Sequence, residues 1–168
     1  MTIEELTDLM TDALRDHPGL TIPPPCSEDE ILKAEKAFNA KFKGDFPDAY
    51  KRVLRRANGI SHNGLTVWPA KREPLFRETI LEANVDFQEN FSDDFIYYGQ
   101  WDEELYVFDL RTKEYCAIEY VGAEAWENFA DADEMFQFML ERAFGEEENW
   151  DVKIQYCLAL RKKRQDGL

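Results

Sequence analysis

The sequence predicts a single α+β domain in which a central antiparallel sheet is packed by helices from both ends of the chain. Apolar residues recur at helical spacing in the first third of the chain and again in the last third. Between them, β-rich runs at 95–98, 105–109 and 115–120 follow one another with short connections, which is typical of an antiparallel meander. The length of 168 residues fits one domain that spans residues 1–168.

Capping boxes predict where the first two helices begin. Thr2 and Glu5 stand at the spacing of an N-cap and its reciprocal partner, ahead of a helix predicted over 2–16. Ser27 and Glu30 repeat the pattern for the next helix. The proline-rich stretch between these helices predicts an extended connector, because proline cannot donate a backbone hydrogen bond.

A third helix and the first strands follow. Pro47 suits the first turn of that helix, and Asn58-Gly59 suits its end, where a left-handed residue is favoured. Ile60 and the run 65–68 predict two short strands. Residues 76–91 carry an apolar face at helical spacing, so they predict a further helix that leads into the meander.

The last third of the chain returns to helical patterns. Trp126 and Phe129 lie three residues apart, and this spacing predicts a short helix. Asp131 or Asp133 then caps the next helix. A final helix is predicted over 149–164, and its basic end places positive charge at the negative end of the helix dipole.

The composition predicts a folded chain with a strongly acidic surface. Hydrophobic residues make up 44% of the chain, and 35 acidic against 20 basic residues give a net charge of −15. Such a charge repels nucleic acid and anionic membranes, because both bind through Lys and Arg. It speeds the encounter with basic partners. An acidic surface also serves solubility alone, and the charge by itself leaves both interpretations open.

The cysteines and the N-terminus indicate a cytoplasmic protein. Cys26, Cys116 and Cys157 are an odd, widely spaced set without a zinc pattern, so we expect reduced core residues. The first ten residues carry acids where a signal peptide carries positive charge. No apolar run reaches the length of about 20 residues that spans a bilayer.

The inventory of reactive groups predicts no catalytic residues, no metal and no cofactor. The two histidines, His17 and His62, have no partner at metal-ligand spacing. The serines stand outside a nucleophile elbow, and the glycines are too scattered to form a phosphate-binding loop. A non-enzymatic protein is therefore expected.

Acidic clusters on either side of the run 95–98 are the candidate site. Neighbouring carboxylates bind hard cations in some proteins, but in turns they are usually solvated, and we favour the solvated interpretation. Mixed with aromatic residues they suit a protein-binding surface, since aromatics anchor interfaces and charge steers encounter. The alternative is that Trp101 only closes the core beneath a turn and contacts no partner. The candidate partner-binding residues are Tyr98, Trp101, Asp93, Asp94, Asp102, Glu103 and Glu104.

Several motifs in a fixed order resemble one protein family. Ser27-Glu28-Asp29-Glu30-Ile31 leads to Ala34-Glu35, then Phe46-Pro47-Asp48-Ala49-Tyr50-Lys51, then Leu54 with Ala57-Asn58-Gly59. Trp68-Pro69 and Phe95-Ile96-Tyr97-Tyr98-Gly99 follow downstream. Together they resemble the SUKH superfamily, which groups fungal cell-wall-assembly regulators of the Smi/Knr type with bacterial proteins, among them YrhA-like members. The resemblance covers about 27–144, and the helices at 2–16 and 149–164 are additions to it.

The resemblance implies an α+β fold with a central antiparallel sheet and no enzymatic activity. Bacterial members are mostly immunity proteins that bind and neutralise a toxin, and fungal members act as intracellular adaptors. Our first hypothesis is therefore an immunity protein whose partner is a cognate toxin, with a basic toxin domain as the partner that the charge suits. The alternative is a cytosolic adaptor or regulator that binds a host protein.

Overall fold

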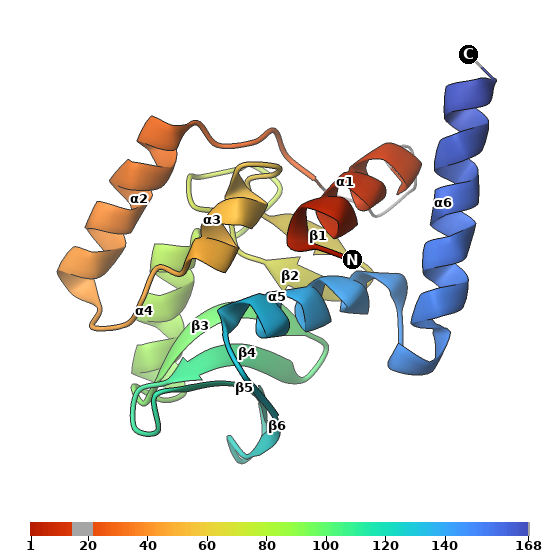
Figure 1. Cartoon of the computed structure of the whole chain (residues 1–168). Coiled ribbons are helices and arrows are strands. Elements are labelled where there is room, and N and C mark those ends of the chain that lie inside the picture. Colours follow the sequence, from red (N-terminus) through yellow and green to blue (C-terminus); the bar gives the residue numbers. More distant parts are fainter. Residues whose placement is uncertain (15–21, 168) are drawn as a thin grey trace.

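The computed structural model describes residues 1–14 and 22–167 and shows an antiparallel meander whose strands pair in chain order (Figure 1). The strands are β1 Ile60–His62, β2 Leu65–Val67, β3 Phe95–Trp101, β4 Glu104–Asp109, β5 Glu114–Glu119 and β6 Ala125–Phe129. The helices are α1 Ile3–Leu14, α2 Glu28–Lys41, α3 Asp48–Leu54, α4 Ile80–Asn90, α5 Ala132–Glu141 and α6 Trp150–Asp166, with 3-10 turns at Arg142–Phe144 and Glu147–Asn149. The predicted α+β fold with its central antiparallel sheet is confirmed.

The helices lie on two sides of the sheet (Figure 1). Tyr97 stacks on Phe87 of α4, with ring centroids 4.8 Å apart. The next residue, Tyr98, instead contacts Phe136 of α5, with centroids 5.9 Å apart. Since successive strand residues point to opposite faces, α4 covers one face of the sheet and α5 the other. Helices α1 and α3 pack on α5, and α6 packs along α1.

Both predicted capping boxes are present. Glu5 donates its backbone N–H to Thr2 Oγ1, and Thr2 donates its own to Glu5 Oε2, each at 3.1 Å. Ser27 and Glu30 form the same reciprocal pair at the start of α2. The predicted helix over 2–16 is seen as α1 up to residue 14; its last two predicted residues and His17 lie outside the described residues.

The helix predicted over 76–91 is shorter, because its capping signal lies later than the apolar pattern suggested. Thr79 accepts from the backbone N–H of Glu82, and the Glu82 carboxylate accepts from Thr79 in return. This capping box begins α4 at Ile80. Phe76 instead belongs to a turn, in which its N–H donates to the carbonyl of Glu73. The predicted cap at Asp131 is confirmed for α5.

The short helix predicted at Trp126 and Phe129 is wrong, because these residues belong to β6. Glu127 pairs with Ala117, and Ala125 pairs with Ile118, so Trp126 is an extra residue in a β-bulge. The bulge turns Trp126 to the side of Phe129, and both rings contact Phe138, with centroids 5.9 and 5.3 Å away. A bulged strand has thus produced the three-residue spacing that is typical of a helix.

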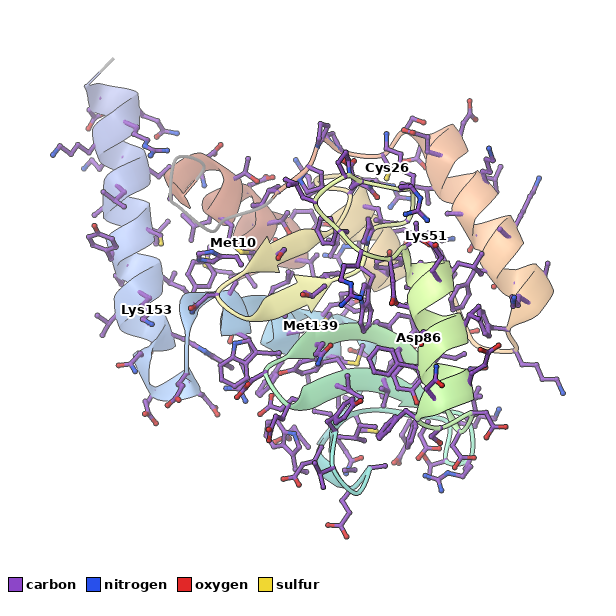
Figure 2. The ribbon with its side chains drawn as sticks, turned by 180° about the vertical axis from the view of Figure 1, so that it is seen from behind. Met10, Cys26, Lys51, Asp86, Met139 and Lys153 are labelled. Atoms are coloured by element: carbon purple, nitrogen blue, oxygen red, sulfur yellow. The ribbon has the colours of Figure 1, made fainter. Side chains whose placement is uncertain are left out.

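A second bulge, in β3, decides where Trp101 points. Tyr97 pairs with Val107 and Gly99 pairs with Tyr106, so Tyr98 is the extra residue. In a regular strand without a bulge, Trp101 would lie on the same face as Tyr97, the face that α4 covers, because residues four apart point the same way. Gly99 is favoured here, because a Cβ atom would lie 2.9 Å from the backbone carbonyl oxygen of Thr66 and would also clash with Met139 Sδ. Figure 2 shows Met139 between α5 and the sheet, and the bulge places Trp101 on this same α5 face.

The hydrophobic core draws buried side chains from helices and strands along the chain. Cys26, Cys116 and Cys157 are buried free thiols, as predicted for core cysteines. The Asn58-Gly59 motif also has a clear local role. The Asn58 side chain accepts from the backbone of Ala70 and donates to the carbonyl of Lys71, so it fixes the loop after β2.

Candidate functional site

Two turns of the meander enclose a hollow at one end of the sheet. Its volume is about 280 Å³. We call it the turn hollow; it is lined by Trp101, Asp102, Glu103, Glu104, Glu119, Tyr120, Val121 and Trp126. The strand register brings these residues together, because Glu104 pairs with Trp101 on one side and with Glu119 on the other. Tyr120 extends the ladder by donating its N–H to the carbonyl of Glu103 at 2.7 Å.

The β3–β4 turn presents two carboxylates to solvent. Trp101 pairs directly with Glu104, so Asp102 and Glu103 alone connect the strands. Asp102 takes a left-handed backbone with φ of 51°, which aspartate tolerates better than most residues. Both residues are exposed. The hairpin therefore holds a pair of negative charges at the rim of the turn hollow.

A buried arginine, Arg142, contacts three residues that line the turn hollow, namely Trp101, Glu104 and Trp126. Arg142 is 7% exposed. Its guanidinium carbon lies 4.6 Å from the ring centre of Trp101, and 4.9, 5.6 and 5.7 Å from those of Phe138, Trp126 and Trp150. Each ring offers its negative face to the cation. Arg142 therefore orients the two tryptophans that line the hollow.

Glu104 neutralises this arginine. Arg142 Nη2 lies 3.2 Å from both carboxylate oxygens of Glu104, and Tyr106 donates its hydroxyl to the same carboxylate at 2.8 Å. Burial nevertheless raises the pKa of Glu104 above its usual value, since desolvation outweighs these two favourable contacts. Because Glu104 is paired, the exposed negative charge of the hollow comes from Asp102, Glu103 and Glu119.

Apolar side chains stand beside these carboxylates. Val121 is 75% exposed, Tyr120 47% and Trp126 38%. Tyr120 is held in place by Phe91 at the end of α4, with ring centroids 5.2 Å apart and planes within 8° of parallel. Aromatic rings next to exposed carboxylates are complementary to a ligand that is both apolar and cationic, such as a basic segment of a protein.

The other candidate residues lie elsewhere. Tyr98 is fully buried, and its hydroxyl donates to the carbonyl of Asp45 at 2.6 Å, so it belongs to the core and offers no surface to a partner. Asp93 and Asp94 precede β3 and Asp102 follows it, and the strand between them spans roughly 20 Å at the usual rise of a strand. Asp94 is 3.4 Å from the guanidinium of Arg111. Neither aspartate lines the turn hollow.

Sequence reasoning missed half of this site. Glu119, Tyr120 and Val121 enter it through the β4–β5 pairing, which the predicted turn between those two runs could have indicated. Trp126 was hidden by the helical spacing of the bulged strand. Arg142 carries no local signal, because its partners come from β3, β4, β6, α5 and α6.

Two further statements hold for residues 1–14 and 22–167, the part of the chain that the structure describes. Within these ranges no group of three or more His, Cys, Asp or Glu residues is arranged to hold a metal ion. None of the helices in the same ranges combines the length and the apolar character that crossing a membrane requires. The turn hollow itself presents carboxylates and aromatic rings.

Comparison with known proteins places the chain in a family. No curated protein matches it. The model of the SMI1 / KNR4 family (SUKH-1) matches residues 25–141, which include α2 to α5 and every lining residue of the turn hollow. The match leaves out α1 and α6, the two helices that the sequence motifs also left outside the resemblance. The chain therefore belongs to the SMI1 / KNR4 family (SUKH-1).

Proposed function

We propose that this chain is a non-enzymatic protein-binding domain of the cytoplasm, an immunity protein that binds and neutralises a cognate toxin through the turn hollow. The observation that carries the proposal is the hollow itself, in which exposed aromatic rings stand beside three exposed carboxylates. Membership of the SMI1 / KNR4 family is consistent with such a domain.

The charge of the whole chain supports a basic toxin as the partner. At −15, the chain attracts a positively charged surface over a distance of about one Debye length, roughly 8 Å at physiological salt. A toxin that acts on nucleic acid has a basic groove for its substrate. An acidic body seated in that groove would exclude the substrate by occupying its charges.

The carboxylates of the hollow suit binding better than catalysis. Glu104 is committed to Arg142, while Asp102 and Glu103 are exposed at a hairpin tip. A general acid or base needs a protected position for its substrate, and the exposed hairpin tip offers none.

A double substitution of the turn tests the proposal. The natural partner is captured on the purified chain from its native cell, identified and expressed, and its affinity is measured. Asp102→Asn with Glu103→Gln should weaken binding by about tenfold, chiefly through slower association, and the loss should shrink at high salt. Glu89→Gln with Asp93→Asn removes the same charge from exposed positions outside the hollow, and should change the affinity by about twofold or less.

Toxin neutralisation is tested in cells. Expression of the identified partner alone should stop growth, and co-expression of this chain should restore it. A partner without toxicity would rule out the immunity function and leave an adaptor. An enzymatic activity of the purified chain that disappears in the Asp102→Asn variant would overturn the non-enzymatic assignment.

A further inference from the structure

The last strand of the meander has one side without a neighbouring strand. In the strand order β1 to β6, β6 pairs with β5 only, and it forms the end of the sheet as described for residues 1–14 and 22–167. Ala125, Trp126, Glu127 and Asn128 are all exposed. A strand in this position presents backbone N–H and C=O groups that another extended segment can pair with.

The negative charge on the β6 edge determines which kind of strand can pair with it. Glu127 lies on β6, and Glu124 lies directly before it; both are exposed. A second copy of this chain would bring the same carboxylates, and its net charge of −15, against them. Like charges across a strand pair are destabilising, whereas opposite charges stabilise it. Charge repulsion therefore disfavours pairing of this edge with a second copy of the chain, whereas a basic strand is complementary to it.

The edge and the turn hollow share one residue. Trp126 is the extra residue of the bulge in β6, and its ring both lines the hollow and lies 5.6 Å from the guanidinium carbon of Arg142. The bulge also interrupts the regular ladder, so only a short segment can pair on this edge. A segment that pairs with Glu127 and Asn128 would run past Trp126 and bring its next side chain to the hollow.

We propose that β6 is a docking edge on which an extended, basic segment of the protein partner adds as a further strand, with one of its Lys or Arg side chains in the turn hollow. This mode rests on the proposed protein-binding function and specifies the kind of segment that the partner contributes. Main-chain hydrogen bonds would supply affinity, and the carboxylates would supply the preference for a basic sequence.

Probe peptides test the mode directly. A fluorescein-labelled peptide that alternates lysine with valine and threonine is titrated with the full chain. We expect binding that is lost when every central amide of the peptide is N-methylated, because methylation removes the ladder donors and keeps the charge. Replacing its lysines by glutamine should weaken binding by about tenfold. Amide hydrogen exchange should slow at Glu127 and Asn128 when the peptide is bound.

Charge reversal on the protein gives the matched control. Glu127→Lys should weaken peptide binding by about fivefold or more, and Glu127→Gln should have a smaller effect of the same sign. Glu89→Lys makes the same charge change on α4 and should alter binding by about twofold or less.

Three outcomes would overturn the edge proposal. The first is equal binding of the N-methylated peptide, and the second is no binding of the basic peptide at millimolar concentration. The third is a dimer of the wild-type chain in sedimentation that the peptide does not dissociate. If the natural partner responds to Asp102→Asn with Glu103→Gln but not to Glu127→Lys, the proposed function stands and the edge mode fails. If the partner responds to neither, both fail.

Discussion

Helices α1 and α6 both lie outside the family match, yet they relate to the core in opposite ways. The apolar side chains of α1 are removed from solvent, and Ile3, Leu6 and Leu9 are each 0% exposed. In α6 only Trp150 and Cys157 are buried along the whole helix. An addition to a family fold can thus be part of the core or lie on its outside.

The difference follows from the apolar pattern of each helix. Ile3, Leu6 and Met10 recur at i, i+3 and i+7, which builds one stripe that faces the core. The apolar residues of α6 are spread around the helix, and Val152 and Tyr156 are 71% and 62% exposed. Figure 1 shows α6 standing at the side of the molecule, with the C-terminus at its free end.

Helices α1 and α6 also contact the rest of the protein through polar groups at different places. Glu4 of α1 pairs with Arg52 of α3 through two guanidinium nitrogens, beside the buried stripe. Helix α6 is anchored at its first residue, where Trp150 donates its indole N–H to the carbonyl of Gly145 at 2.8 Å and stacks near Arg142. Helix α6 thus contacts, through its first residue, the arginine that packs against the two tryptophans of the turn hollow, while α1 is joined to α3.

The largest expected effect is a core truncation in α1. Leu6→Ala should lower the free energy of unfolding by about 3 kcal/mol, because the side chain is fully buried and leaves a cavity. Leu158→Ala, in α6, should cost about 1 kcal/mol, since that side chain is only partly buried. Urea denaturation measures both. Equal losses would show that α6 belongs to the core as fully as α1 does.

A smaller effect on stability is expected when acid protonates Glu4 of α1, which pairs with Arg52 of α3. The hydrogen bonds from Arg52 lower the pKa of Glu4 from 4.5 to about 2. A carboxyl with a lowered pKa stabilises the fold above its unfolded pKa, and this contribution is lost as the pH falls from 4.5 towards 2. When the pH falls from about 6 to about 3, the free energy of unfolding should therefore decrease by about 1 kcal/mol less in Glu4→Gln than in the wild type. The expected difference is modest because the side chains of Glu4 and Arg52 are 28% and 24% exposed.

Glu104 provides a comparison of opposite sign in the same experiment. Burial raises its pKa, so the folded state binds its proton more tightly than the unfolded state does. Protonation of Glu104 thus favours folding as the pH falls, and Glu104→Gln removes that gain. This variant should lose more stability on acidification than the wild type. A change in the same direction as Glu4→Gln would contradict the assigned cause of the Glu104 shift.

These comparisons also show what could be predicted from the sequence. Capping boxes such as Ser27 with Glu30 and the β-rich runs of the meander are local signals, and they led to the right elements. The bulges at Tyr98 and Trp126 are set by the register of each strand against its neighbour, which no pattern within the bulged strand reveals. A one-residue bulge reverses the face on which the following side chains lie. The turn hollow depends on both bulges, so its outline could not be read from the order of residues alone.

The smallest expected effect concerns the ion pair that joins the two helices. Asp12 of α1 lies 3.4 Å from the guanidinium of Arg161, and Asp12 is 48% exposed. Asp12→Asn should change stability by about 0.5 kcal/mol or less, because the pair is solvated and a negative charge near the end of α1 opposes the helix dipole. Global unfolding cannot separate the helices at this scale, but amide hydrogen exchange can. The last turns of α6 should exchange faster in Asp12→Asn, while α1 keeps the protection that its buried stripe provides.

Asp8→Asn is the matched control, since Asp8 pairs at 3.3 Å with Arg56 beyond α3 and should leave exchange in α6 unchanged. Faster exchange in α1 itself would show that the pair supports the core, and the contrast between the two helices would then fail.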